Sequence, residues 1–235
     1  MTVPEHTVSP IPTGLSFEEA SCLGVAGLTA AMALWKWLEV PGSPKIETQT
    51  IPKTGYLLIW GGATITANFA VQIAVLGGLT VIAVTSEKSR SSVEKLGAAH
   101  VVTRDGKSCE QIVAEIRAIG GDNITRGIDL VGTTSAGYCL QALSTTQRAL
   151  FAPLAMISAK SIVPANISVE TVEMKKFVLE EGSYVYAVAL NRLVEERRIT
   201  LPSIEVLHGG LDVIVAGLDR IKTGDFAGKR VVVNM

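Results

Sequence analysis

Residues 56–86 read YLLIWGGATITANFAVQIAVLGGLTVIAVTS, and this stretch decides the fold class. An apolar run enters a turn of small residues, a helical segment follows with Phe69, Ile73 and Leu76 on one side, and a second apolar run begins at Val81. This order predicts a βαβ unit. In such a unit the turn after the first strand typically binds a nucleotide pyrophosphate, because backbone N–H groups converge at the helix N-terminus.

The same alternation continues through the next seventy residues. The predicted strands lie at 79–85, 100–103, 128–131 and 149–157, and the predicted helices at 89–96, 108–119 and 136–143. Strands that alternate with helices at this spacing form a parallel sheet with right-handed crossovers. The sequence therefore predicts the α/β class, with a doubly wound, Rossmann-type parallel sheet and flanking helices.

The flanks of this core have different patterns. Residues 1–15 are proline-rich and predict an N-terminal arm, and residues 16–235 predict one Rossmann-type domain. Within that domain we expect the core at about 56–158 and C-terminal helices with a closing strand at 184–235. Ser16 and Glu19 have capping-box spacing, which predicts the start of a long buried helix. We expect that helix to break near Gly24 or Gly27.

Composition narrows the functional class. The 235 residues carry a formal net charge of −1 and are 48% hydrophobic, which favours neither a nucleic acid nor a membrane surface as partner. Three widely spaced cysteines and three scattered histidines give no zinc-ligand spacing, so we expect no metal site. No apolar run reaches 18 residues, and we expect a reducing, cytoplasmic location.

Several segments match one known family. They are Pro12 with Leu15–Ala20, Leu28–Ala30 with Leu34, Ile59–Ala63, Ala70–Ala74, Lys95–Ala98, Gly209–Leu211 and Gly224–Val233. Together they resemble the zinc-free branch of the medium-chain dehydrogenase/reductase superfamily, which contains quinone reductases and fungal trans-acting enoyl reductases. This resemblance implies that the chain lacks the N-terminal substrate domain that completes the catalytic cleft in the family.

The resemblance also assigns residues to a phosphate loop. Where the family carries glycines at the first, fourth and seventh loop positions, this chain has Gly61, Thr64 and Ala67. Glycine at the fourth position lets the pyrophosphate approach the backbone, so we expect the branched side chain of Thr64 to hinder it. Ala67 adds only a methyl group, which we expect the loop to tolerate.

If NADPH is bound, the resemblance and the strand ends imply one set of ligands. These cofactor-binding candidates are Gly61, Gly62, Ala63, Thr64, Ala67, Thr85, Ser86, Lys88 and Arg90. The second strand ends without the acidic residue that holds an adenosine ribose in NAD enzymes, and hydroxyls and two cations suit a 2′-phosphate instead. The alternative is that Lys88 and Arg90 simply begin a surface helix.

No residue pattern identifies a catalytic acid, base or nucleophile. In an open α/β sheet, ligands bind at the carboxyl ends of the strands, and the segment around 184 borders the cleft in the family. The candidate pocket residues are Thr64, Ile65, Thr66, Thr133, Ser135, Ser158, Tyr184 and Tyr186. For the hydroxyl residues the alternative is ordinary helix capping, and for the tyrosines it is core packing. Asp129 is expected to be structural.

Three functional hypotheses follow. The preferred one is a repurposed reductase-like enzyme of secondary metabolism that needs no cofactor and promotes a redox-neutral cyclisation, such as a Diels–Alder reaction, of a small apolar natural-product intermediate. The second is an NADPH-dependent enoyl or quinone reductase whose missing cleft wall comes from a homodimer or a synthase partner. The third is a non-catalytic remnant that binds a partner.

Overall fold

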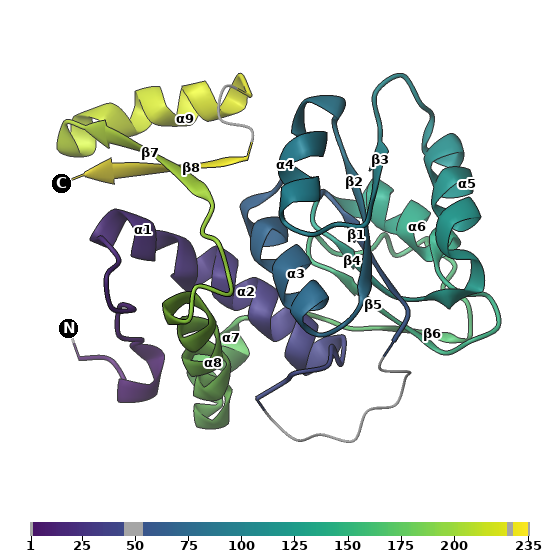
Figure 1. The fold of residues 1–235 in the computed structure, drawn as a ribbon, viewed down its shortest axis with the longest axis horizontal. Coiled ribbons are helices and arrows are strands. Elements are labelled where there is room, and N and C mark those ends of the chain that lie inside the picture. Colours follow the sequence, from purple (N-terminus) through teal and green to yellow (C-terminus); the bar gives the residue numbers. More distant parts are fainter. Residues whose placement is uncertain (1, 45–53, 225–227, 235) are drawn as a thin grey trace.

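The computed structural model describes residues 2–44, 54–224 and 228–234 (Figure 1). Six parallel strands form the main sheet in the order β3-β2-β1-β4-β5-β6. The strands are β1 (Tyr56–Trp60), β2 (Thr80–Thr85), β3 (His100–Thr103), β4 (Ile124–Asp129), β5 (Ala149–Pro153) and β6 (Ile167–Val169). This is the strand order of a dinucleotide-binding fold, with its topological switch point between β1 and β4. The predicted fold class is confirmed.

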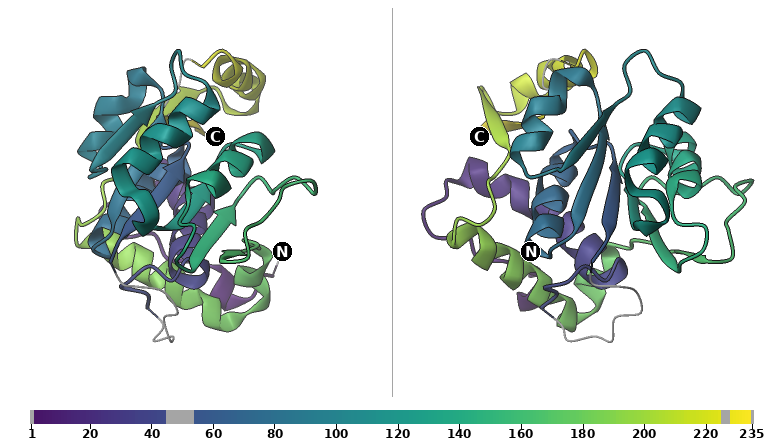
Figure 2. Two further views of the ribbon diagram at one scale, coloured as in Figure 1. Left: turned by 90° about the vertical axis from the view of Figure 1, so that its right-hand side faces the viewer. Right: turned by 45° about the vertical axis from the view of Figure 1, so that its right-hand side comes forward.

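Helices cover both faces of the sheet (Figure 2). They are α3 (Ile65–Leu76), α4 (Arg90–Lys95), α5 (Cys109–Gly120) and α6 (Thr133–Ala142). Successive strand residues alternate between two core clusters: Leu57 and Ile59 lie in the larger one with α3, and Leu58 and Trp60 lie in the other with α5 and α6. Both faces are buried, which explains why the strands read as continuous apolar runs.

The predicted long helix is present and unbroken from Phe17 to Trp37. It consists of α1 (Phe17–Cys22), a π-helical stretch (Leu23–Gly27), α2 (Leu28–Met32) and a second π-helical stretch (Ala33–Trp37). Ser16 and Glu19 form the expected capping box. Gly27 does not break the helix; a Cβ there would lie 3.0 Å from Leu190, so this glycine allows close packing between helices. By length and composition the helix would suffice to cross a membrane, but 56% of its most apolar window is buried by protein.

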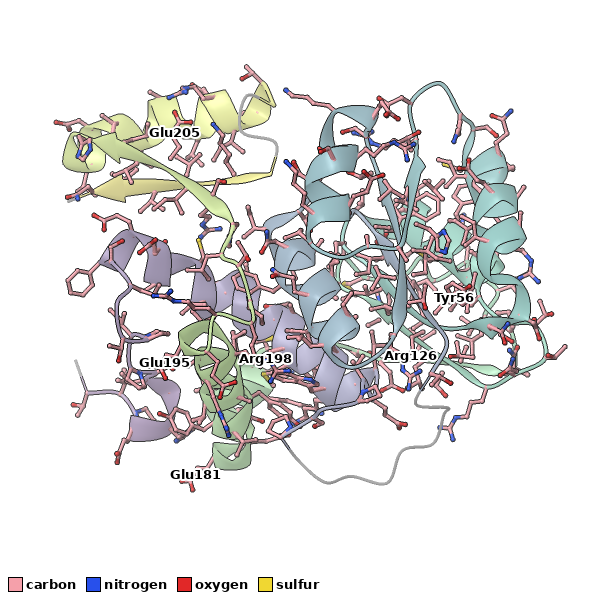
Figure 3. All side chains as sticks on the ribbon, viewed as in Figure 1. Tyr56, Arg126, Glu181, Glu195, Arg198 and Glu205 are labelled. Atoms are coloured by element: carbon pink, nitrogen blue, oxygen red, sulfur yellow. The ribbon has the colours of Figure 1, made fainter. Side chains whose placement is uncertain are left out.

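A buried arginine joins this helix to the sheet (Figure 3). Arg126 on β4 is fully buried and donates from Nε to the carbonyl of Leu38 (2.9 Å) and from Nη2 to that of Glu39 (3.1 Å). Burial lowers the pKa of its guanidinium to about 10, so the group stays charged at neutral pH. Carbonyls at the end of a helix lack intrahelical donors, and Arg126 supplies them.

The C-terminal third departs from the sequence expectation. After α7 (Lys175–Leu179) and α8 (Tyr184–Glu195), strand β7 (Ser203–His208) pairs in parallel with β8 (Lys229–Asn234), and α9 (Ile214–Lys222) connects them. The last strand therefore joins a separate two-stranded sheet instead of the main one (Figure 1). We call β7, α9 and β8 the C-terminal unit. Strands β6 and β7 were not predicted, and the N-terminal arm contains a short 3-10 turn (Glu5–Thr7).

Candidate nucleotide-binding site

Two adjoining hollows lie at the carboxyl ends of β1 and β2, and together we call them the nucleotide hollow. The first, of about 320 Å³, is lined by residues of the loop after β1, by the end of β2 and by Arg104. The second, of about 260 Å³, reaches between α3 and α4 to residues Thr200, Leu201 and Ser203. They share Ala63, Thr64, Ser89 and Gly228. The position agrees with the general rule for ligands of open α/β sheets.

The phosphate loop is shaped by a glycine that no other residue could replace without strain. Gly61 has φ +95°, and a Cβ there would lie 2.8 Å from Cγ2 of Val131. The N–H groups of Gly61 and Gly62 both donate to the carbonyl of Val84, at 3.1 and 2.8 Å. The loop is thus fixed to the end of β2, and its backbone lies close to the floor of the hollow.

Thr64 takes a role that the sequence did not predict. It is the N-cap of α3, and its Oγ1 accepts the N–H of Ala67 at 3.1 Å. The hydroxyl is therefore bound by its own helix instead of projecting freely into the phosphate space. Among the described residues, the N–H groups of Ile65 and Thr66 have no acceptor, as expected of a first helical turn. A phosphate group can accept hydrogen bonds from both of these N–H groups.

The cations of the hollow differ from those expected. The guanidinium of Arg90 is held by Glu87 (3.0 Å), by the carbonyl of Val101 (3.1 Å) and by Glu94 (3.6 Å), and it does not line the hollow. Lys88 and Lys95 line it, and so does Arg104. Neither Lys88 nor Arg104 forms an ion pair within the described part of the chain. Arg104 was missed, although a basic residue directly after the third strand was a usable signal.

The remaining cofactor candidates are mostly brought together. Gly61, Gly62, Ala63, Thr64, Thr85, Ser86 and Lys88 all line the nucleotide hollow. Ala67 is fully buried beneath the first turn of α3, where it packs in the larger core cluster. No carboxylate side chain is among the described lining residues. Beside Lys88, Asp105 accepts the N–H of Glu87 at 2.6 Å.

None of the other pocket candidates is among the lining residues, although Ile65 and Thr66 directly follow Thr64, which lines both parts of the hollow. Ile65 and Thr66 begin α3, Thr133 is exposed at the start of α6, and Ser158 is exposed on the loop after β5. Ser135 is buried. Its Oγ accepts the N–H of Gly132 and donates to the carbonyl of the same residue, so Ser135 caps the start of α6. Tyr186 is fully buried in the core beside the long helix, and Tyr184 packs against the same cluster.

Asp129 supports the hollow from below. Its Oδ2 accepts the N–H groups of Gly132 (3.0 Å) and Val131 (3.4 Å), and Val131 lines the hollow. The residue is fully buried, and burial raises the pKa of its carboxyl above the ordinary value. Trp60, also in the wall, stacks on Tyr138 with ring centroids 6.5 Å apart. Asp129 is structural, as predicted.

Within the described residues, no group of three His, Cys, Asp or Glu side chains is arranged to hold a metal ion. The 3-2-1-4-5-6 sheet, the glycine loop and the N–H groups at the start of α3 define a dinucleotide-binding domain. The hollow offers cations and hydroxyls as ligands.

Comparison with known proteins gives the family. A trans-enoyl reductase of Gibberella fujikuroi is 30% identical over 98% of this chain and 68% of its own length, and a trans-enoyl reductase of Talaromyces variabilis is 27% identical over 99% and 66%. The chain belongs to the fungal trans-enoyl reductase family. It spans about two thirds of the length of the curated relatives that it matches. No family model matches the chain.

Solved structures agree on the fold. A putative NADPH:quinone reductase from Bacillus thuringiensis superposes with a TM-score of 0.79 at 18% identity, covering 99% of this chain and 69% of that one. The CurK enoyl reductase gives a TM-score of 0.76 at 18% identity, covering 95% and 64%. These structures show that the chain shares its fold with enoyl and quinone reductases. The expected resemblance to trans-enoyl reductases is confirmed by the sequence relatives.

Proposed function

We propose that this protein binds NADPH in the nucleotide hollow and takes part in the reduction of an enoyl or related α,β-unsaturated carbonyl group. The observation that carries the proposal is the pairing of a glycine phosphate loop with three cations, Lys88, Lys95 and Arg104, in a hollow where none of the described lining residues is a carboxylate. NAD enzymes of this fold place an acidic residue on the adenosine ribose, whereas a 2′-phosphate needs positive charge.

The described residues fit the cofactor part by part. The N–H groups of Ile65 and Thr66 would bind the pyrophosphate, and the left-handed Gly61 lets it approach the loop. Lys88 and Arg104 would pair with the 2′-phosphate, beside the hydroxyl of Ser86. Trp60 and Val131 would exclude water from the wall of the hollow. When bound, NADPH supplies the hydride for reduction.

The names of the relatives support an enoyl substrate, since two of them are called trans-enoyl reductases and the CurK protein an enoyl reductase. We propose a small apolar natural-product intermediate as substrate. We further propose a second copy of the chain or a synthase as partner. None of the described residues that line the hollow is a strong general acid, so proton delivery would depend on such a partner or on water.

A titration of the protein with NADPH, followed by the fluorescence of the bound cofactor, tests the proposal. Replacing Lys88 or Arg104 by alanine should weaken NADPH binding at least tenfold, because a hydrogen bond to a charged group contributes about 1.5–3 kcal/mol. Arg90→Ala is the matched control and should change the affinity less than twofold, since Glu87 and Glu94 already hold its guanidinium. An equal loss in all three variants, or no binding at millimolar NADPH, would refute the assignment.

The redox-neutral cyclisation stays a prediction, and the capping role of Thr64 weakens one of its motives, the altered phosphate loop. If Thr64 hindered the cofactor, Thr64→Gly would raise NADPH affinity. We expect no rise, because the variant only removes a cap and costs a few tenths of a kcal/mol. Turnover of a candidate intermediate by cofactor-free protein, without a change in mass, would instead favour the cyclase.

A further inference from the structure

A third hollow, of about 370 Å³, lies between the N-terminal arm and the helices beneath it, and we call it the arm hollow. Its floor is formed by α1, the first π-helical stretch and α2, and its sides by α7 and α8. It shares no lining residue with the nucleotide hollow. In Figure 1 the arm runs down beside α8, away from the phosphate loop.

Polar contacts hold the arm over this space. Asn191 donates from Nδ2 to Oγ of Ser9 (2.8 Å) and to the carbonyl of Pro10 (2.7 Å), and the N–H of Thr13 donates to Glu195 (3.1 Å). Figure 3 labels Glu195 where the arm and α8 meet. Ile11, one of the apolar side chains of the arm, remains 43% exposed. The arm is thus fixed by hydrogen bonds at its edge, and a hollow remains between it and the helices below.

The floor and sides of the arm hollow are mainly apolar. Leu23, Leu28, Phe177 and Leu190 line it, and each is otherwise buried in the protein. Packed interiors leave few voids larger than a water molecule, because the lining of an empty space loses its dispersion contacts. A hollow of this volume and lining falls at the small end of the range of ligand pockets, which are typically apolar with a few polar groups.

Two features indicate the shape and chemistry of an occupant. Gly24 lies in the helical floor, and no heavy atom is found within 4 Å of the position of a Cβ there, so the hollow is open at this point of the floor. At the other side, Oδ1 of Asn191 accepts no hydrogen bond from the described residues, while both donors on its Nδ2 are used. An elongated apolar molecule fits the first feature, and a hydroxyl or amide N–H fits the second.

We propose that the arm hollow is a binding site for an unbranched alkyl chain, of a small molecule that carries a hydroxyl or amide group to meet Asn191. The site is separate from the nucleotide hollow and does not depend on NADPH. Binding buries apolar surface against Leu23, Leu28 and Leu190, which supplies the driving force.

The test uses N-phenyl-1-naphthylamine, a neutral dye that fluoresces when it leaves water, and 1-decanol as competitor. The wild-type protein should bind the dye at one site, 1-decanol should displace it, and saturating NADPH should not. Gly24→Leu fills the hollow from the floor and should weaken dye binding at least tenfold. A side chain at a helical glycine favours the helix, so the variant should fold.

Gly137→Leu on α6 is the matched control, because Gly137 is also a helical glycine with nothing within 4 Å of its Cβ position. It should leave dye affinity within twofold. Ile11→Trp fills the same hollow from the arm and should act like Gly24→Leu. The proposal is overturned if wild-type protein binds no dye, if 1-decanol fails to compete, or if both filled variants keep native circular dichroism and undiminished dye binding.

Discussion

The six-stranded sheet and the C-terminal unit are both parallel β-structures, yet they are buried to very different extents. In β1, every residue after Tyr56 is buried, and β4 and β5 are buried throughout. In β7 and β8 no residue is buried, and in α9 only Gly217 is. The apolar side chains of Val215, Leu218 and others on α9 are largely exposed.

The difference in burial indicates what stabilises the main sheet and what stabilises the C-terminal unit. A parallel sheet normally requires cover on both faces, and the main sheet has it. The C-terminal unit is connected to the rest by few contacts: Asn234 donates to Glu18 (2.8 Å), and Ile204 packs against the larger core cluster. We expect it to open locally before the sheet does, because few buried apolar contacts resist that opening.

The largest expected effect is the difference in the free energy of unfolding that is lost when a buried and a partly exposed isoleucine are each replaced by alanine. Ile82 on β2 is fully buried, and Ile82→Ala should lower the free energy of unfolding by about 2–5 kcal/mol. Ile214 on α9 is 36% exposed, and Ile214→Ala should cost less than about 1 kcal/mol. Urea denaturation of both variants measures the difference. Equal losses would show that the C-terminal unit is as firmly packed as the sheet.

The next effect concerns the backbone of the phosphate loop. Gly61→Ala should cost roughly 1–3 kcal/mol in strain and reduce NADPH affinity at least tenfold, because its Cβ would displace Val131 from the hollow. Gly78→Ala is the control, since Gly78 also has a positive φ (+83°) but has open space and lies outside the hollow. Gly78→Ala should lose stability only. Calorimetric titration with NADPH separates the two outcomes.

A smaller effect depends on pH and concerns the buried carboxyl of Asp129. Since burial raises its pKa in the folded state, the folded chain holds this proton more tightly than the unfolded chain does. The contribution of the protonated Asp129 carboxyl to the free energy of unfolding is therefore complete at low pH. It is lost as the pH rises from the pKa of the unfolded chain through that of the folded chain. In Asp129→Asn this dependence should disappear. Unfolding free energies of both proteins between pH 3.5 and 7 test the sign, and a parallel pair of curves would contradict it.

The smallest effect is expected for an exposed ion pair of the C-terminal unit. Arg220 on α9 donates to Glu205 on β7 at 2.9 Å, and both side chains are partly exposed. Figure 3 labels Glu205 on this unit. Arg220→Ala should lower stability by at most about 1 kcal/mol, and added salt should weaken the effect. A loss above about 2 kcal/mol would mean that this pair, and not apolar burial, holds the unit together.

The local pattern of apolar residues was sufficient to predict most strands of the main sheet. The strand predicted at 100–103 has the observed bounds, and the helix predicted at 108–119 is displaced by one residue. The strand predicted at 128–131 was wrong in its bounds, because Arg126 and Gly127 interrupt the apolar run of the true strand, 124–129. Only the carbonyls of Leu38 and Glu39, distant in sequence, allow an arginine to be buried there.

The sequence alone determined the βαβ order and the place of the phosphate loop, because both depend on periodicity and small residues within a few turns of chain. Tertiary structure alone decided which cation faces the hollow, since Glu87 and Glu94 hold Arg90 while Arg104 is left for a ligand. It also decided that Ser203 and Gly228 join the wall and that β8 pairs with β7. The physical reason is that hydrogen-bond and ion-pair partners are chosen by proximity in space, which composition and spacing along the chain do not specify.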